Sequence, residues 1–355
     1  MKSYDIAVLG GDGIGPEVVA EECKVLAVVA TRFNLRLNFT EYNLGGERFL
    51  RTGELLPESV LTELRGHDAI LLGALGTPGV PVGVLERGII LALRTRLDQY
   101  VNVRPVRLLP GVTSPVADIT TDRCDMIVLR ENIEGLYGGA GGISYRGTPA
   151  EVATQESVNT YFGVERLVRV GFERAQVRDG RLTMFHKTNV LGYAGSLWTR
   201  VVDELAEEFS DVQVDYVNID AACLYLVTQP ERFDVIVTDS MFGDIITDLG
   251  AAVTGGIGLA PSASLSPSSE MPGSFEPIHG SAPDIAGKGI ANPIGAILAG
   301  GLCLADLGEV EAAQMVEEAV VAVLSLGEET LNQTEPPPTA EIGDLVAAVA
   351  ERLEL

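Results

Sequence analysis

Two aspartates stand one helical turn apart in the segment DSMFGDIITDLG, residues 239–250. Asp244 and Asp248 have the i, i+4 spacing at which like charges on a helix repel each other. The chain already has a formal net charge of −25, so this added repulsion indicates that a positive group lies between the two carboxylates. Two or three carboxylates without histidine suit Mg²⁺ or Mn²⁺ better than Zn²⁺. The pair is therefore a candidate site for a divalent cation.

Helix capping offers a simpler explanation for one of these aspartates. Asp239 or Ser240 is a natural N-cap, and Asp244 in the following first turn would interact favourably with the helix dipole. Asp248 lies beyond that turn and has apolar neighbours. Capping therefore explains Asp244 but leaves Asp248 without a structural reason.

Charged residues also close several apolar runs of strand length. Arg130 ends MIVLR, Lys187 ends RLTMFHK, Asp220 ends VQVDYVNID and Asp239 ends FDVIVTD. One such charge is usually a solvated loop residue, but open α/β sheets bind ligands beyond the carboxyl ends of their strands. Several strand ends that supply Arg, Lys and Asp therefore favour a polar site at that edge. Lys187 is conspicuous because the chain has only four lysines.

Four arginines lie close together in LALRTRLDQYVNVRPVRLLPG, residues 91–111. Arg96 and Arg107 are the candidates for ordinary solvated charges. The planar guanidinium group of arginine suits bidentate binding of a carboxylate. Arg94 and Arg104 are therefore candidates for binding a small dianionic substrate.

Apolar runs of strand length alternate with helical patterns along most of the chain. A strand-like run over 4–10 precedes a helical pattern over 16–33 that has proline in its first turn, and the alternation recurs over 124–239. This order predicts an α/β fold with a parallel sheet. The Gly- and Thr-rich segment 137–157 predicts a projecting hairpin. From about residue 256 we expect mostly loops, followed by helices.

The segment GGDGIGPE, residues 10–17, joins the first strand to the first helix. It fails the dinucleotide-binding pattern G-x-G-x-x-G because its glycines are spaced by two and Pro16 follows the last of them. Two explanations remain open. The glycines form a tight strand-to-helix turn, or they allow the backbone to approach a ligand closely.

Composition excludes several classes of protein. The chain has 355 residues, of which 46% are hydrophobic, and this length favours two domains. With 50 acidic against 25 basic residues, binding to nucleic acid or to an anionic membrane is not expected. The four cysteines are scattered singly and predict free thiols. No apolar run is long enough for a membrane span and no signal peptide is evident, so we expect a cytoplasmic protein.

Eight motifs together resemble one known family, the isocitrate/isopropylmalate family of metal-dependent β-decarboxylating dehydrogenases, and within it the 3-isopropylmalate branch. They occur in the family's order along nearly the whole chain: GDGIGPE, LERGIILALR, VNVRP, RENIEGLY, HKTNVL, VNIDAA, FDVIVTDSMFGDIITD and FEPIHGSAPDIAGKGIANP. The resemblance implies oxidation of a small 2-hydroxy-3-carboxy acid by NAD and loss of its β-carboxylate as CO₂. For the 3-isopropylmalate branch the product is 4-methyl-2-oxopentanoate, in leucine biosynthesis.

The resemblance also implies roles for the residues above. It assigns the Mg²⁺ or Mn²⁺ ligands to Asp220, Asp244 and Asp248, and Asp220 would come from the partner subunit of a homodimer. Lys187, also from the partner, would accept a proton, and Tyr137 would help to protonate the enolate. The substrate carboxylates would be bound by Arg94, Arg104 and Arg130.

The family binds its cofactor outside any standard Rossmann site, in the loop over 279–292. The residues implied are His279, Gly280, Ser281, Ala282, Pro283, Asp284, Ile285 and Asn292, with Asp284 on the ribose and Asn292 on adenine. Asp284 favours NAD because its carboxylate would repel a 2′-phosphate. The implied fold has a discontinuous first domain over 1–104 and 256–355. Its second domain, 105–255, carries the metal site, the dimer contacts and an arm over about 137–157.

Three departures from the branch concern the substrate's side group. Ser240 and Met241 stand where Asn and Leu are common, Asn132 also suits the malate, tartrate and isocitrate branches, and ERGIILALR aligns with a one-residue insertion. Ile89 and Ile90 before Arg94 predict an apolar side group. A D-malate, tartrate or specialised alkylmalate enzyme, and a non-catalytic protein that binds a small anion, remain alternatives. The shortage of histidine disfavours a zinc-type phosphorylated-hydroxythreonine dehydrogenase.

Overall fold

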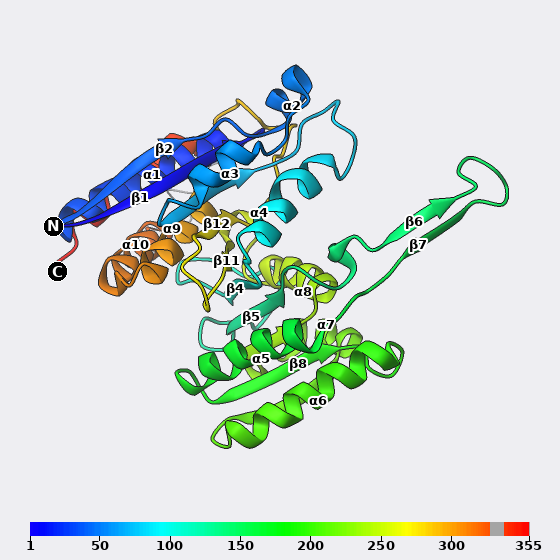
Figure 1. The fold of residues 1–355 in the computed structure, drawn as a ribbon. Coiled ribbons are helices and arrows are strands. Elements are labelled where there is room, and N and C mark those ends of the chain that lie inside the picture. Colours follow the sequence, from blue (N-terminus) through cyan, green and yellow to red (C-terminus); the bar gives the residue numbers. More distant parts are fainter. Residues whose placement is uncertain (327–336, 355) are drawn as a thin grey trace. The chain divides into compact units, whose positions relative to one another are not determined.

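The computed structural model describes residues 1–326 and 337–354 (Figure 1). The chain divides into two compact units. The first comprises Met1–Gln99, Arg107–Thr121 and Ala251–Leu355, and the second comprises Tyr100–Val106 and Asp122–Gly250. Division into domains over 1–104 with 256–355 and over 105–255 stays a prediction. No helix in the described ranges is long and apolar enough to cross a membrane.

The first unit contains five strands in the order β2-β1-β3-β12-β11. Their bounds are Leu35–Glu41, Lys2–Gly11, Ala69–Ala74, Gly273–Pro277 and Pro261–Leu265. Strand β1 pairs in parallel with β2 and β3, β12 is parallel to β3, and β11 is antiparallel to β12. All six residues of β3 are buried, as expected for a parallel strand covered on both faces.

Helices pack on both faces of this sheet and on one another. The helices of the first unit are α1 (Gly15–Arg32), α2 (Gly46–Thr52), α3 (Glu58–Leu64), the π-helical turn η1 (Glu86–Ile90), α4 (Leu91–Arg96), the 3₁₀-helix η4 (Ile257–Leu259), α9 (Ile294–Asp306), α10 (Val310–Ser325) and α12 (Thr339–Arg352). Of these, α10 packs on α1 and α9, and α12 packs on α1 and α10. Successive residues of β1 point to opposite faces. Leu9 joins a core cluster with Ile89 and Leu93, whereas Val8 joins another with Val18 of α1. The first cluster fixes α4, which carries Arg94.

The second unit contains the strands β4-β5-β10-β8-β9 in that order. Their bounds are Val101–Arg107, Asp125–Glu131, Val235–Thr238, Arg181–His186 and Gln213–Asn218. Strand β10 is parallel to β5 and β8, and β8 is parallel to β9. The carboxyl ends of these four strands therefore lie at one edge, where Arg130, Lys187, Asp220 and Asp239 follow or end them.

Four α-helices, two short 3₁₀-helices and a hairpin complete the second unit among the described residues. The α-helices are α5 (Tyr161–Gln176), α6 (Gly192–Glu208), α7 (Ile219–Thr228) and α8 (Ser240–Val253), and the 3₁₀-helices are η2 (Leu136–Gly138), which carries Tyr137, and η3 (Pro230–Arg232). The antiparallel strands β6 (Gly141–Ser144) and β7 (Val152–Gln155) are exposed throughout. Figure 1 shows them extending away from the rest of their unit. The predicted α/β fold with a projecting hairpin is confirmed.

The expectation of mostly loops after residue 256 is wrong for β11 and β12. Their sequences PSASL and GSFEP are rich in Ser, Gly and Pro, which are uncommon in strands. Small side chains nevertheless suit a strand covered closely by a helix, and β11 is buried throughout. Both strands contact α9, which indicates that packing has overridden the local preference.

Candidate active site

Helix α8 begins shortly after β10 and carries Asp244 and Asp248. Asp239 caps the helix, because its carboxylate accepts a hydrogen bond of 2.7 Å from the backbone N–H of Phe242. Burial raises the pKa of Asp239 to about 6, against the opposing effects of this bond and of Arg130. No acidic residue lies in the first turn of α8, so the dipole explanation of Asp244 is wrong.

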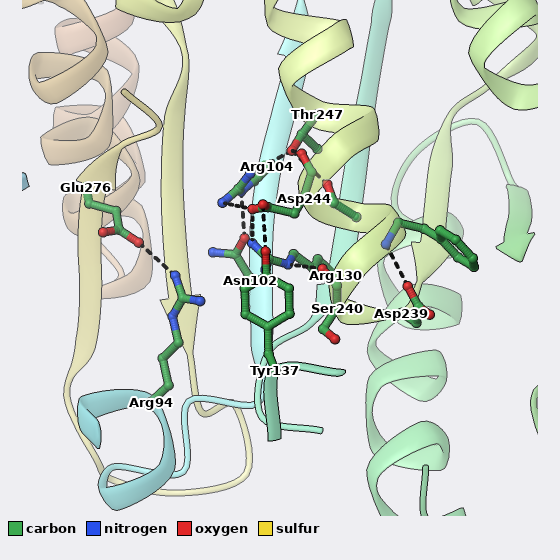
Figure 2. Close-up of polar contacts among 12 residues, drawn as sticks. Arg94, Asn102, Arg104, Arg130, Tyr137, Asp239, Ser240, Asp244, Thr247 and Glu276 are labelled. Carbon is green, nitrogen blue, oxygen red and sulfur yellow. Dashed lines mark hydrogen bonds and ion pairs between the residues drawn. The ribbon is translucent and has the colours of Figure 1, made fainter. Parts of the chain in front are cut away.

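Asp244 instead accepts hydrogen bonds from two residues at the strand edge (Figure 2). Arg130 Nη1 lies 2.6 Å from one carboxylate oxygen, and the Tyr137 hydroxyl donates to the other at 2.8 Å. Arg104 Nη2 lies 3.5 Å from the first oxygen. Two arginines and a phenol therefore converge on one carboxylate.

Both arginines are almost completely buried and have fixed orientations. Arg130 and Arg104 are 1% and 6% exposed. Arg130 Nε donates to the backbone carbonyl of Ser240 at 2.7 Å. Arg104 Nε donates to Asn102 Oδ1 and its Nη1 to Thr247 Oγ1, each at 2.7 Å. Two buried guanidinium groups held in this way form a preorganised binding site for carboxylates.

Tyr137 lies over Arg130 and is suited to donate a proton. The Arg130 guanidinium carbon is 4.7 Å from the centre of the Tyr137 ring. Burial, together with Asp244, raises the pKa of the Tyr137 phenol, although Arg130 opposes this shift. The phenol therefore keeps its proton at neutral pH.

Asp248 has no hydrogen-bond partner among the residues that the structure describes. Burial raises its pKa, and the neighbouring Asp244 raises it further. A divalent cation beside both carboxylates would remove this repulsion, so the pair fits Mg²⁺ or Mn²⁺. Within 1–326 and 337–354 of one chain, however, no three His, Cys, Asp or Glu side chains gather closely enough to hold a metal.

Lys187 and Asp220 form a pair of their own in the second unit. Lys187 follows β8, Asp220 lies in the first turn of α7, and the Nζ–Oδ1 distance is 2.6 Å. The hydrogen bond from Lys187 lowers the pKa of Asp220. The side chains are 24% and 68% exposed, so both are accessible to solvent.

Arg94 belongs to the first unit. Its Nη2 lies 3.2 Å from Glu276 Oε1 of β12, as drawn in Figure 2. Ile89 is fully buried in the core, whereas Ile90 is partly exposed. Of the proposed pair, Ile90 therefore remains accessible to a ligand.

The remaining arginines of residues 91–111 pair at the surface, as expected of solvated charges. Arg96 lies 2.6 Å from Glu58. Arg107 pairs with Glu317.

The glycine turn of residues 10–17 packs directly against the loop over 279–292. Ile14 N–H donates to the Ser281 carbonyl at 2.9 Å. Gly13 has φ +59°, and a Cβ there would lie 1.9 Å from the same carbonyl oxygen. The glycine is therefore required by close approach of two backbone segments within the first unit.

The loop itself offers groups that suit a dinucleotide. His279 Nε2 is buried without a partner among the described residues, although Nδ1 contacts the Gly280 carbonyl at 3.0 Å. Asp284 is exposed. Asn292 Oδ1 accepts a hydrogen bond of 3.0 Å from Ile294 N–H at the start of α9, which orients its amide. An unpartnered ring nitrogen and an exposed carboxylate in the same loop would suit a ligand that has both ring nitrogens and hydroxyls.

Sequence reasoning did not identify Asn102, Thr247 or Glu276 as partners of the candidate arginines. Asn102 lies two residues before Arg104 on one strand, so both point to the same face. Thr247 is three residues after Asp244, on the same side of α8. These spacings were available in the sequence, but only the structure shows that the side chains meet.

The model of the family described as isocitrate/isopropylmalate dehydrogenase matches residues 5–346. The 3-isopropylmalate dehydrogenase of Thermobifida fusca is 55% identical over 353 residues, which cover 99% of each chain. That of Frankia casuarinae is 56% identical over 346 residues, covering 97% of this chain and 99% of the relative. The solved isocitrate dehydrogenase of Methylococcus capsulatus has a TM-score of 0.88 at 33% identity, covering 98% of this chain and 100% of its own.

Proposed function

The chain belongs to the isocitrate/isopropylmalate dehydrogenase family, and from this premise we propose that it oxidises and decarboxylates 3-isopropylmalate with NAD and Mg²⁺ or Mn²⁺. The products would be 4-methyl-2-oxopentanoate, CO₂ and NADH. The resemblance inferred from the motifs is confirmed, and the protein is a dehydrogenase that acts on a small molecule. The convergence of Arg104, Arg130 and Tyr137 on Asp244 supports the proposed chemistry.

The arginines would bind the substrate. A 2-hydroxy-3-carboxy acid has two carboxylates, and the buried guanidinium groups of Arg104 and Arg130 offer paired N–H donors to them. Arg94 would add a third positive group. Because the Arg104 and Arg130 side chains are already oriented by hydrogen bonds within the protein, little conformational entropy is lost when the substrate binds.

Asp244 and Asp248, with Asp220 of the partner subunit, would hold the divalent cation. When bound, such a cation polarises the substrate oxygens and stabilises the negative charge that develops on them. The two carboxylates of α8 are placed for this by their spacing of one helical turn. The third would come from a second chain in a homodimer.

Lys187 and Tyr137 would move the protons. The Lys187 amine would accept the proton of the substrate hydroxyl as a hydride leaves the carbon that bears this hydroxyl. The Tyr137 phenol, which keeps its proton at neutral pH, would donate it to the carbon that has lost CO₂. Its hydrogen bond to Asp244 holds the hydroxyl at the candidate metal site.

The loop over 279–292 would bind NAD. Asn292, whose amide is oriented by Ile294 N–H, would contact the adenine, and the exposed Asp284 would accept hydrogen bonds from the ribose hydroxyls. A 2′-phosphate would meet the charge of Asp284, so NAD is the preferred cofactor.

A substrate panel with NAD and Mg²⁺ tests the proposal. We expect the highest kcat/KM with 3-isopropylmalate, followed by D-malate, because Ile90 offers an apolar surface to a side group. A higher value with D-malate, tartrate or isocitrate would overturn the substrate and leave the family assignment intact.

A further inference from the structure

The hydroxyl of Tyr216 connects the two segments that carry Lys187 and Asp220. Tyr216 lies on β9, and its hydroxyl oxygen is 3.1 Å from the backbone nitrogen of Thr188 and 2.9 Å from Thr188 Oγ1. The same oxygen is 2.9 Å from Asn218 Oδ1. Thus one hydroxyl contacts the residue after Lys187 and the residue two positions before Asp220.

These contacts use the full hydrogen-bonding capacity of a phenol. The hydroxyl has one proton to donate and two lone pairs. It accepts from the N–H and the Oγ1–H of Thr188 and donates to Asn218, and the His186 carbonyl lies farther away, at 3.5 Å. Asn218 is the N-cap residue of α7 but makes no capping bond with its side chain. Its oxygen is engaged by Tyr216 instead.

The Lys187–Asp220 pair needs such support because it is open to solvent. Exposed ion pairs hold their geometry weakly, since water and salt screen the attraction and both side chains lose entropy. Lys187 begins a turn, in which its backbone carbonyl accepts hydrogen bonds from the N–H groups of Val190 and Leu191. Beside the Lys187–Asp220 pair itself and the pairing of β8 with β9, the Tyr216 hydroxyl is a further link between this turn and the start of α7.

We propose that Tyr216 is a positioning residue for the reaction. Its hydroxyl holds the backbone of the Lys187–Thr188 turn against the first turn of α7. Lys187 and Asp220 thereby keep the separation at which one accepts the substrate proton and the other contributes a carboxylate. The role in catalysis rests on the proposed function, whereas the hydrogen bonds between Tyr216 and Thr188 do not depend on it.

The test replaces Tyr216 with phenylalanine, which removes the hydroxyl and keeps the ring. We expect kcat with 3-isopropylmalate to fall at least tenfold, while the KM for NAD changes less than twofold because the proposed cofactor residues belong to the other unit. Tyr193→Phe is the matched control, since Tyr193 is 98% exposed, and it should leave both constants unchanged. In a background that carries both Lys187→Ala and Asp220→Ala, Tyr216→Phe should not reduce the residual rate further.

Hydrogen–deuterium exchange of residues 187–191 gives a readout that does not depend on activity. Tyr216→Phe should speed exchange of the Thr188 amide at least tenfold, and Tyr193→Phe should not. Unchanged exchange, or a Tyr216→Phe enzyme with the wild-type kcat, would overturn the proposal. A multiplicative loss in the background lacking both Lys187 and Asp220 would also overturn it, because only a general structural defect would lower the rate when neither positioned side chain is present. A wild-type protein inactive on 3-isopropylmalate would overturn the proposed function. The exchange rate of the Thr188 amide would still show whether Tyr216 restrains this turn.

Discussion

At the scale of single residues, the candidate site contains a buried arginine, Arg104, that hydrogen-bonds to uncharged side chains. Arg104 donates to Asn102 and Thr247 rather than being neutralised by a close bidentate carboxylate. A guanidinium held in this way keeps its charge available to a ligand. In a chain with a net charge of −25, such buried cations would favour the binding of the proposed dianionic substrate.

Thr247→Val tests the orientation of Arg104. The change keeps the shape of the side chain but removes an acceptor for a charged donor, a bond worth about 1.5–3 kcal/mol. We expect the KM for 3-isopropylmalate to rise about tenfold. Thr62→Val is the control, because Thr62 bonds only to a helix carbonyl four residues earlier. Equal effects of the two changes would show that Thr247 acts through helix stability alone.

A buried glutamate predicts a pH dependence of stability. Glu22 of α1 is 0% exposed, and neither carboxylate oxygen has a partner among the described residues. Burial raises its pKa well above 4.5. The folded state therefore holds a proton that the unfolded state releases. This stabilisation is complete below the unfolded pKa and is lost as pH rises through the folded pKa.

Glu22→Gln should remove this contribution. The free energy of unfolding, measured in urea at fixed protein concentration, should fall less between pH 5 and pH 8 in the variant than in the wild type. Glu47→Gln, at an exposed position, should behave like the wild type. An unchanged pH dependence in Glu22→Gln would refute the assignment.

The sequence identified charged residues better than their neutral partners. Arg104, Arg130, Tyr137 and Asp244 were candidates, and the structure brings these four together. Tyr216 carries no charge and lies in an ordinary strand pattern. Its role depends on where the turn after β8 meets α7, which no local spacing specifies.

At the scale of elements, the π-helical turn η1 lies in ERGIILALR, the segment for which we expect a one-residue insertion relative to some isopropylmalate enzymes. Leu91 N–H donates to the Glu86 carbonyl, five residues earlier. An extra residue in a helix is commonly accommodated in this way, often near functional sites. The turn therefore sets which side chains before α4 face the core and which, like Ile90, are accessible.

Deletion of Gly88 should convert the turn into a regular α-helix. The residues before the deletion would rotate by about 100° relative to α4. We expect the ratio of kcat/KM for 3-isopropylmalate to that for D-malate to fall at least tenfold, with thermal unfolding as a check on folding. An unchanged ratio in a folded variant would show that η1 has no part in specificity.

Sequence patterns predicted the elements where local preference and packing agree. The strands β1, β3, β5, β8 and β10 are apolar runs, and the structure places them as parallel strands. The strands β11 and β12 escaped prediction because their small polar residues are buried by contacts distant in sequence. The pairing and register of these two strands depend on contacts from the whole fold, so local sequence does not specify them.

At the scale of the whole molecule, the account requires two chains. Asp244 and Asp248 would come from one subunit, and Lys187 with Asp220 from the other. In a two-fold dimer each site contains every residue once, so variants damaged on opposite sides of the interface can complement each other. Lys187→Ala and Asp244→Ala should each be nearly inactive.

Refolding the two variants together in equal amounts should restore about a quarter of the wild-type activity, because half of randomly paired dimers are mixed and one of their two sites is intact. Lys187→Ala mixed with Asp220→Ala should stay inactive, since both defects lie on the same contributing chain. Recovery in the second mixture, or none in the first when mixed dimers form, would rule out a shared site.

In the proposed reaction, this chain couples oxidation of the substrate to loss of its β-carboxylate. The most direct measurement uses 3-isopropylmalate labelled with ¹³C in that carboxylate, and follows labelled CO₂ and NADH together in the presence of Mg²⁺. The account predicts one labelled CO₂ for each NADH, and neither product when the divalent cation is removed by chelation. NADH formed without labelled CO₂, or turnover that is unchanged by chelation, would contradict it.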